Sequence, residues 1–471
     1  MIRKIYKFLN IDNSKYRKLY LFQISLIFFV GILSVFFRYP MSWYDEQVHY
    51  ARVITYSNDL DSKSEGYIEK GEQELINQSM RTISKSLGES TSEVISFRWS
   101  NSFKNVSDSR IVKTKDGSAA SVYSPLVYSP YIVAAWIAKV IGLHTITTFL
   151  FLRLIGFLTV FALFLFSIRK IPFGKASLIV IALVPTVTIS FTAISADTLT
   201  YGLLFLVISQ LMSIYQKVSL SSKVKSKEII SLIICSLFLT LAKMPAFTVL
   251  ALYIPLIYIG FKKGKLSKQQ NIILGMSFIV CIISALTWYM SIKNINGNVT
   301  YYGAVNIDQS KQLEVLLTHP LRTLRVFFEN IINFPFFDFQ LGYSDNLKWT
   351  HVPVLISLFS VFGFISSLKI WDGKLSIINR EDRIIYNSLS KLIFLGIMLL
   401  IFLIFLLQST EVGSEAIVGI QGRYFFAFLP LLIPFSNGKY MLDQSQSVKV
   451  LFLSTIPLIY YLTLLLVQLK N

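Results

Sequence analysis

Four side chains that could do chemistry lie within the stretch SWYDEQVHYARVI, residues 42 to 54, which follows an apolar run. They are Asp45, Glu46, His49 and Arg52. At about 100° per helical residue, Asp45, His49, Arg52 and Tyr56 share one stripe of a helix, with Glu46 beside it. Two carboxylates this close cannot both ionise freely, so we expect one pKa to be raised and the other to be held low by Arg52 or a cation. Such a split is the usual preparation for acid–base catalysis.

The two acids also have a structural interpretation. Asp45 and Glu46 would stand at the first turn of the expected helix, where the helix dipole favours acids in any protein. Both interpretations remain open at the level of the sequence. We take Asp45 and Glu46 as the candidate catalytic residues, and His49 and Arg52 as candidate substrate-binding residues.

Other polar residues interrupt apolar runs farther along the chain. Asp197 lies in SADT between two apolar segments, Lys243 lies in LAKMP, and Arg423 and Tyr424 begin an apolar run in GRYFFAFLP. A cation at the boundary of a membrane span is costly and is often functional, although Lys and Arg also extend along apolar surface toward water. We expect Asp197, Lys243, Arg423 and Tyr424 to bind substrate, with the cations directed at an anionic group.

The composition is that of a membrane protein with many spans. Of 471 residues, 54% are hydrophobic and only 15% are charged, which departs from a soluble globular mixture. The formal charge of +19 is spread over many short segments and forms no basic, aromatic-interleaved face, so nucleic acid is not an expected partner. Cys235 and Cys281 lie in apolar runs, which argues against a disulfide framework.

No metal site can be assigned from the sequence. The four histidines have no metal-ligand spacing. Several acids are expected on one face, so a divalent cation such as Mg²⁺ or Mn²⁺ could join them, but no ligand set is determined.

Eleven apolar segments are long enough to cross about 30 Å of hydrocarbon, and they predict a single all-α, membrane-embedded domain over residues 1–471. These segments are 19–37, 149–168, 176–193, 198–216, 228–242, 245–261, 271–290, 351–369, 391–408, 423–436 and 449–468. The first segment is longer than a signal-peptide core, so we expect it to be retained.

The orientation of these spans follows from the basic residues of the short connections. More than half of the 45 Lys and Arg residues fall on one side if the N-terminus is cytoplasmic. The segments 38–148 and 291–350 then form two large extracytoplasmic loops, and the candidate residues lie at that outer level of a cell membrane. The first loop carries a helical pattern at 67–87, a turn at 115–117 and an interfacial helix within 124–143; the second carries amphipathic helices broken at Pro320.

Several motifs resemble one bacterial family of membrane proteins, domain of unknown function 2142. In chain order they are YDEQVHYARV, YSPLVYSPYIVAAWIAKVIGL with FLRLIGF, ALVPTVTISFTAISADTLTYG, LAKMP, THPLRTL with QLGYSD, and GIQGRYFFAFLPLLIP. That family is similar in turn to the C-type (GT-C) glycosyltransferases. The resemblance implies a multi-span fold, an acid in the first outer loop, to which Asp45 and Glu46 correspond, and a polyprenyl-phosphate-linked sugar as donor.

The expected function is therefore transfer of a sugar from a polyprenyl-phosphate donor to a glycan or wall-polymer acceptor outside the membrane. Asp45 would take the proton of the acceptor hydroxyl, Glu46 or Asp197 would position the acceptor or a metal, and Lys243 and Arg423 would hold the phosphate. Two other classes stay open: a transporter or flippase of lipid-linked glycans, and a non-catalytic partner in wall-polymer export. A transporter is expected to show inverted repeats, and we find none in the sequence.

Overall fold

The structure is a computed structural model of a helical protein. It describes residues 2–11, 15–62, 66–88, 108–292, 307–336, 339, 341, 354–373, 379–434 and 441–470. The motif QLGYSD and the ends 351–353 and 435–436 of two expected spans lie outside or almost entirely outside the described residues.

Helices dominate the first half of the chain. In order, its elements are α1 (Ile2–Phe8), α2 (Arg17–Phe37), α3 (Glu46–Asn58), β1 (Gly66–Glu69), α4 (Lys70–Gly88), β2 (Ile111–Thr114), the 3₁₀ helices η1 (Ser118–Val122) and η2 (Pro125–Tyr128), α5 (Ser129–Val140), α6 (Thr145–Lys170), α7 (Lys175–Ala182), α8 (Pro185–Thr192) and α9 (Ala196–Ser219).

The second half continues in the same way. Its elements are α10 (Ser226–Ala242), the 3₁₀ helix η3 (Met244–Leu252), α11 (Tyr253–Lys262), α12 (Lys268–Ile292), α13 (Gln309–Thr318), α14 (Pro320–Asn333), α15 (Val354–Ser367), α16 (Arg380–Gln408), α17 (Arg423–Phe426), the 3₁₀ helix η6 (Leu429–Leu432), α18 (Gln444–Leu453) and α19 (Ile456–Lys470).

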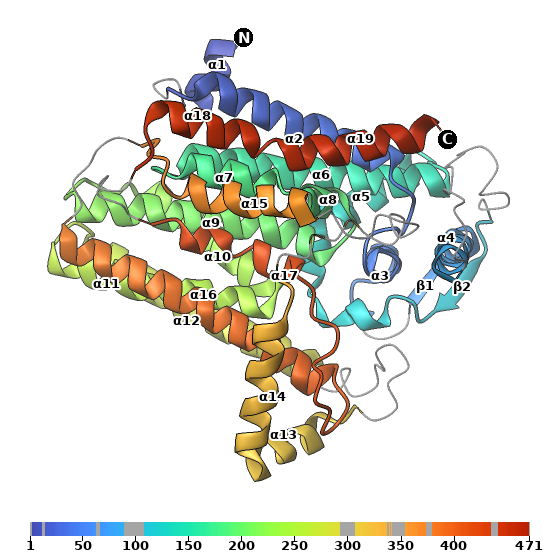
Figure 1. Ribbon diagram of the computed structural model, residues 1–471. Coiled ribbons are helices and arrows are strands. Elements are labelled where there is room, and N and C mark those ends of the chain that lie inside the picture. Colours follow the sequence, from blue (N-terminus) through green and yellow to red (C-terminus); the bar gives the residue numbers. More distant parts are fainter. Residues whose placement is uncertain are drawn as a thin grey trace.

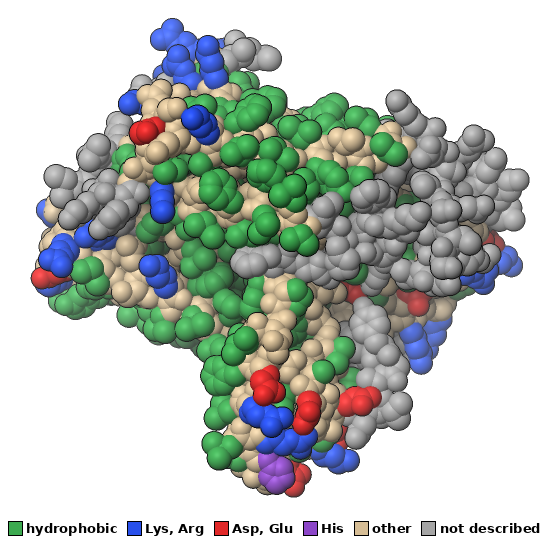
Figure 2. All heavy atoms as spheres, in the orientation of Figure 1, with side chains coloured by type: hydrophobic (Ala, Val, Ile, Leu, Met, Phe, Trp, Pro, Cys, Tyr) green, Lys and Arg blue, Asp and Glu red, His purple; other side chains and the backbone are tan. Residues whose placement is uncertain are grey.

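The long helices run side by side in one bundle (Figure 1). Helix α1 lies at one end of the bundle, and α3, α4, β1 and β2 gather at the other, which we call the site end. Helix α9 is the centre: 94% of its apolar window is buried, against 22% for α12 and 33% for α16. The outer helices therefore present apolar side chains outward, as Figure 2 shows along the flank of the bundle, and as a protein solvated by lipid requires.

Seven helical segments of the described chain are long and apolar enough to cross a membrane, so a polytopic α-helical protein is confirmed, whereas the count of eleven is not. The seven segments are Arg17–Phe37, Thr145–Lys170, Ala196–Ser219, Met244–Lys262, Lys268–Ile292, Arg380–Gln408 and Gln444–Val467.

The other four expected spans are shorter or broken. Segment 176–193 is the pair α7 and α8, bent by 73°, because Pro185 begins α8 and disfavours helical backbone at the residue before it. Helix α10 has 17 residues, and the described part of segment 351–369 forms a 14-residue helix, α15. The described part of segment 423–436 contains α17 and η6, of four residues each, and Pro430 near the start of η6 prevents one continuous helix.

A small sheet departs from the all-α expectation. Strands β1 and β2 pair antiparallel, with Gly66 opposite Thr114 and Glu69 opposite Ile111. Helix α4 follows β1 directly and covers residues 70–87 of the expected helical pattern, whereas residues 67–69 belong to β1. The segment 124–143 forms η2 and the 12-residue helix α5, which packs against α3 and α6.

Polar contacts tie the helices together at the end opposite the site end. The Asp372 carboxylate accepts hydrogen bonds from Tyr20 Oη (2.8 Å) and from the backbone N–H groups of Gly174 and Ala176 (2.7 Å each) at the start of α7. Lys263 after α11 pairs with Asp382 at the start of α16. These contacts join α2, α7, α11 and α16, so the site end is built on a braced bundle.

Candidate functional site

Asp45 and Glu46 leave the chain in different directions. The segment between α2 and α3 turns back on itself, and Asp45 adopts a left-handed backbone with φ of 63° directly before α3 begins at Glu46. Asp tolerates this region better than most residues with a β-carbon. The left-handed turn separates the two carboxylates, so they do not point together as the sequence led us to expect.

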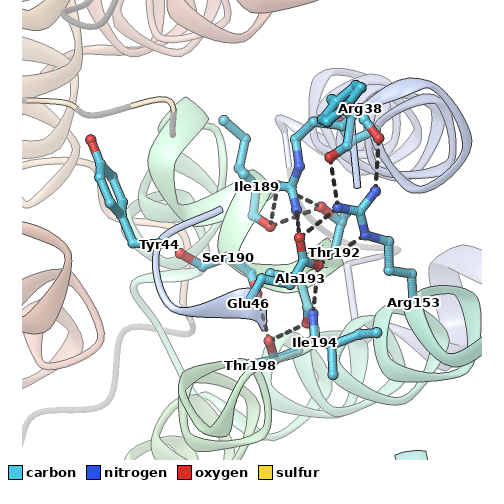
Figure 3. Close-up of polar contacts among 12 residues, drawn as sticks. Arg38, Tyr44, Glu46, Arg153, Ile189, Ser190, Thr192, Ala193, Ile194 and Thr198 are labelled. Atoms are coloured by element: carbon cyan, nitrogen blue, oxygen red, sulfur yellow. Dashed lines mark hydrogen bonds and ion pairs between the residues drawn. The ribbon is translucent and has the colours of Figure 1, made fainter. Parts of the chain in front are cut away.

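Glu46 is the centre of a buried ion cluster. Its side chain is fully buried and receives Arg153 Nε at 2.9 Å on Oε1 and Arg153 Nη2 at 2.6 Å on Oε2. Arg38 Nη2 lies 3.5 Å from Oε2, and the Ile194 N–H donates to Oε1 at 3.0 Å. Figure 3 shows these groups converging from separate elements, with Tyr44 pointing away from them. We call Glu46, Arg38 and Arg153 the closed cluster.

The closed cluster has a structural role. Burial alone would raise the pKa of the Glu46 carboxyl, but the guanidinium groups of Arg153 and Arg38 outweigh it and hold this pKa below its usual value. Arg153 also donates to the carbonyl oxygens of Arg38 (2.8 Å) and Tyr39 (3.1 Å). Both Glu46 oxygens are therefore engaged within the protein, where they join α2, α3, α6 and the turn before α9. This geometry favours a structural role for Glu46 over the expected catalytic role.

Asp45 instead meets Arg423. Arg423 Nη2 lies 2.9 Å from Asp45 Oδ2, and its Nη1 donates to the Tyr44 carbonyl at 3.3 Å. The Arg423 side chain is only 3% exposed, whereas that of Asp45 is 31% exposed. Arg423 Nε is buried without a hydrogen-bond partner. The pair thus joins an accessible carboxylate to a buried guanidinium that has donor capacity left.

A second acid and cation stand beside this pair. Lys243 Nζ lies 2.5 Å from Asp197 Oδ1, and their side chains are 19% and 11% exposed. The Tyr424 ring links the two pairs, since Lys243 Nζ lies 4.7 Å and the Arg423 guanidinium carbon 5.2 Å from its centroid. We call Asp45, Arg423, Asp197, Lys243 and Tyr424 the open cluster.

His49 borders the open cluster. Its Nδ1 lies 2.6 Å from Tyr128 Oη, and its ring packs against Tyr123 and Tyr128. Burial is the largest influence on its pKa and lowers it to about 4, while the charges of Asp45 and Asp197 raise it and those of Arg423 and Lys243 lower it. His49 is therefore neutral near pH 7.

Arg52 takes no part in either cluster. Its guanidinium lies 4.2 Å over the Tyr56 ring and donates to the Ser62 carbonyl, and its side chain is buried. It braces α3 against the segment that follows. The arginines that contact the two acids are Arg38 and Arg153 at Glu46 and Arg423 at Asp45. Substrate binding by Arg52 stays a prediction.

Contacts with neighbouring elements fix the positions of Arg423 and Asp197. Tyr201 Oη of α9 donates to the Arg423 carbonyl at 2.6 Å. Phe425 of α17 packs against Phe334, Phe336 and Phe402, with ring centroids 5.2 to 6.1 Å apart. Ser195 caps α9 by accepting the Asp197 N–H. Arg423 and Asp197 are therefore positioned by a packed aromatic wall and a helix cap.

Six of the predicted residues lie together in the structure, whereas the closed cluster was not predicted. Asp45, His49, Asp197, Lys243, Arg423 and Tyr424 come together, as expected, from segments far apart in the chain. The overlooked residues, Arg38 and Arg153, had a signal: Arg153 interrupts the apolar run FLFLRLIGF, where a charge needs a buried partner.

The open cluster does not offer a divalent-cation site. Among the residues that the structure describes, no group of three or more His, Cys, Asp and Glu side chains is close enough to hold a metal. Asp45 and Asp197 each carry a cationic side chain where a metal ion would bind. This donor set does not fit the octahedral oxygen shell that Mg²⁺ requires.

Comparison with known proteins adds one finding. The model of the family described as "Predicted membrane protein (DUF2142)" matches residues 28–432, which include both clusters. No curated protein and no solved structure matches the chain significantly.

Proposed function

The chain belongs to this family of predicted membrane proteins, and from its open cluster we propose that it is an inverting glycosyltransferase using a polyprenyl-phosphate-linked sugar at the outer face of a cell membrane. One observation carries the proposal: Asp45, the most accessible acid of the cluster, lies 2.9 Å from a buried arginine with a free donor. Transfer of a sugar from a phosphate needs a base for the attacking hydroxyl and, beside it, cationic groups that bind the leaving phosphate.

The proposed reaction uses the two sides of the open cluster differently. Asp45 accepts the proton of the acceptor hydroxyl as that oxygen attacks the anomeric carbon. The bond from this carbon to the phosphate oxygen breaks, and its electron pair leaves with the polyprenyl phosphate. Arg423, a planar fork that can meet two phosphate oxygens, and Lys243 stabilise the leaving phosphate. Direct attack of this kind inverts the anomeric centre and needs no covalent intermediate.

Binding of the donor would also release the base. A donor phosphate competes with the Asp45 carboxylate for Arg423. Donor binding therefore weakens the ion pair and leaves the Asp45 carboxylate available to the acceptor hydroxyl. His49 and Asp197 then border the acceptor, with neutral His49 supplying a hydrogen bond.

The proposed orientation places the site end outside the cell. The short basic connections fall at the opposite end of the bundle, near Lys175 and Lys263, where positive charge favours the cytoplasm. A polyprenyl phosphate keeps its phosphate at the headgroup level, which is the level of an anion clamp at a helix end. The acceptor would be a surface glycan or a wall polymer.

The test is an assay with purified protein and a panel of polyprenyl-phosphate sugars, each offered with and without glycan acceptors. The proposal expects release of polyprenyl phosphate that requires acceptor and is lost in Asp45→Asn. Transport of an intact lipid-linked sugar across a vesicle membrane, without release of polyprenyl phosphate from any donor, would instead favour a flippase.

A further inference from the structure

Two helices stand apart from the bundle. Helices α13 and α14, which we call the arm (Gln309–Asn333), project from its side at the site end, and α14 lies across the direction of the long helices (Figure 1). Pro320 begins α14 directly after His319. The arm therefore has the placement of an element that lies along a membrane surface while the bundle crosses the membrane.

One stripe of α14 is apolar and exposed. Leu321 is 82% exposed, Leu324 52%, Phe328 51% and Ile332 78%. These residues recur at i, i+3, i+7 and i+11, which confines them to roughly 80° of the helix circumference. We call them the apolar stripe. An exposed, contiguous apolar face on a defined element marks a contact surface.

The other sides of α14 contact the rest of the protein, and these contacts show in which direction the apolar stripe faces. Val326 is buried, and Phe327 packs on Phe402 of α16, with ring centroids 6.1 Å apart. Asn330 Nδ2 donates to the Glu415 carbonyl and its Oδ1 accepts from the Ile417 N–H. One side of α14 thus faces the bundle and the next is covered by the segment between α16 and α17.

The remaining side of α14 is charged. Arg325 pairs with Glu329 (3.4 Å) and Glu415 (3.8 Å), and these side chains are more than half exposed. Arg322 donates to the Gly413 carbonyl. In Figure 2 the charged side chains of the arm face the viewer, whereas hydrophobic side chains line the edge turned toward the flank of the long helices. The stripe therefore continues the apolar surface of the bundle.

From this arrangement we infer that the apolar stripe of α14 is inserted into the outer leaflet, at the boundary between headgroups and acyl chains. The partner is the lipid surface itself. An amphipathic helix lies in this plane when its apolar face meets acyl chains and its charged side stays in the headgroup region. The mixed charges of Arg325, Glu329 and Glu415 complement zwitterionic as well as anionic headgroups, so the insertion requires no particular lipid.

The lipid contact has a consequence for the site. Phe334, directly after α14, and Phe336 pack on Phe425 of α17. The arm and Arg423 are thus parts of one packed unit, and the depth of α14 in the leaflet sets the level of Arg423 relative to the lipid surface. The inference of lipid contact does not depend on the proposed reaction.

Site-directed spin labelling tests the insertion without an activity assay. In the full chain with Cys235→Ala and Cys281→Ala, single cysteines replace Leu321, Phe328 or Ile332 in the stripe and, as a matched control, Glu329 on the charged side. Each labelled protein is placed in phosphatidylcholine nanodiscs, and its collisions with oxygen and with a water-soluble nickel chelate are measured by power saturation. Thermal melting shows that each variant is folded.

Insertion predicts labels at the stripe that collide readily with oxygen and several-fold less with the nickel chelate than the label at Glu329. Labels at the stripe that meet the nickel chelate as readily as the control would show that the stripe is in water. Labels shielded from both reagents and immobilised would show a protein contact, from a second copy or from this chain. Either result would overturn the inference.

Discussion

Asp45 and Glu46 are neighbours in the chain, yet Glu46 lies in the closed cluster and Asp45 in the open cluster, and their surroundings differ. The closed cluster surrounds Glu46 with two guanidinium groups and a backbone N–H, and leaves it fully buried. In the open cluster the Asp45 carboxylate pairs with the Arg423 guanidinium, and the Asp45 side chain is 31% exposed. A carboxylate with both oxygens engaged by buried donors can only hold structure together, whereas a carboxylate that pairs with a guanidinium and has access to solvent can exchange that guanidinium for a substrate.

The difference also concerns the cations. The Arg153 guanidinium donates hydrogen bonds to Glu46 and to two carbonyl groups, whereas Arg423 is buried and its Nε has no hydrogen-bond partner. An unsatisfied buried donor is costly in a folded protein. A site that binds an anion gains from such a donor, because the ligand supplies the missing acceptor. The two clusters thus separate the stability of the site end from its chemistry.

The largest expected effect is on stability, at the closed cluster. Arg153→Met keeps the side-chain length and leaves the Glu46 charge buried without its main partner, so we expect a loss of about 3 to 5 kcal/mol. The measurement is thermal melting in detergent. The double variant Glu46→Gln with Arg153→Met removes both charges and should recover part of the loss; an unchanged melting temperature in Arg153→Met would contradict a structural closed cluster.

At the open cluster the expected effect is on turnover. Arg423→Lys keeps the charge and loses the fork, and Arg423→Ala loses both, so donor use should weaken clearly in the first and by roughly 2 to 4 kcal/mol of transition-state stabilisation in the second. Turnover is measured against donor concentration. Arg325→Lys on the arm is the matched control, and parental donor affinity and rate in Arg423→Lys would remove Arg423 from the clamp.

A smaller effect concerns pH and His49. Its pKa in the folded protein, about 4, lies below the ordinary value of about 6.5. Between these two pH values His49 is protonated in the unfolded chain but neutral in the folded protein. The contribution of neutral, buried His49 to the free energy of unfolding is therefore complete above pH 6.5 and is lost as the pH falls toward 4. Melting temperatures over this range should fall less steeply in His49→Asn than in the parent; parallel profiles would argue against a buried, neutral His49.

The smallest expected effect is that of metal removal. Because Arg423 and Lys243 already neutralise Asp45 and Asp197, we expect a chelator to leave turnover nearly unchanged and added Mg²⁺ or Mn²⁺ to stimulate it little. Activity that is abolished by the chelator and restored by either ion would show that a metal ion replaces Arg423 or Lys243 as the partner of a carboxylate.

Hydrophobic periodicity and the length of the apolar runs predicted the helical bundle well. They did not predict features that depend on tertiary contacts. Long apolar runs gave α2, α6, α9, α12 and α16. The sequence could not show that Pro185 splits one run into two helices bent by 73°, or that the four-residue strands β1 and β2 pair across a long stretch of chain.

The sequence indicated most residues of the open cluster, but it did not indicate that Asp45 and Glu46 would lie in different clusters. Charges that interrupt apolar runs pointed to Lys243 and Arg423, and the adjacent acids to Asp45. The separation of Asp45 from Glu46 depends on one left-handed residue and on where α6 brings Arg153, and no local pattern encodes either. Helical spacing suggested Arg52 as the cation of the acids, whereas Arg52 turns to Tyr56.

Turnover and thermal melting, measured together for Asp45→Asn and Glu46→Gln, test most directly whether Asp45 is the base and Glu46 is structural. Asn tolerates the left-handed backbone of Asp45 and removes its basicity, so Asp45→Asn should melt near the parent while turnover falls at least about a hundredfold. Glu46→Gln should lower the melting temperature, because it leaves Arg153 and Arg38 without their carboxylate. Near-normal turnover in an Asp45→Asn protein that melts like the parent would contradict the assignment of Asp45 as the base.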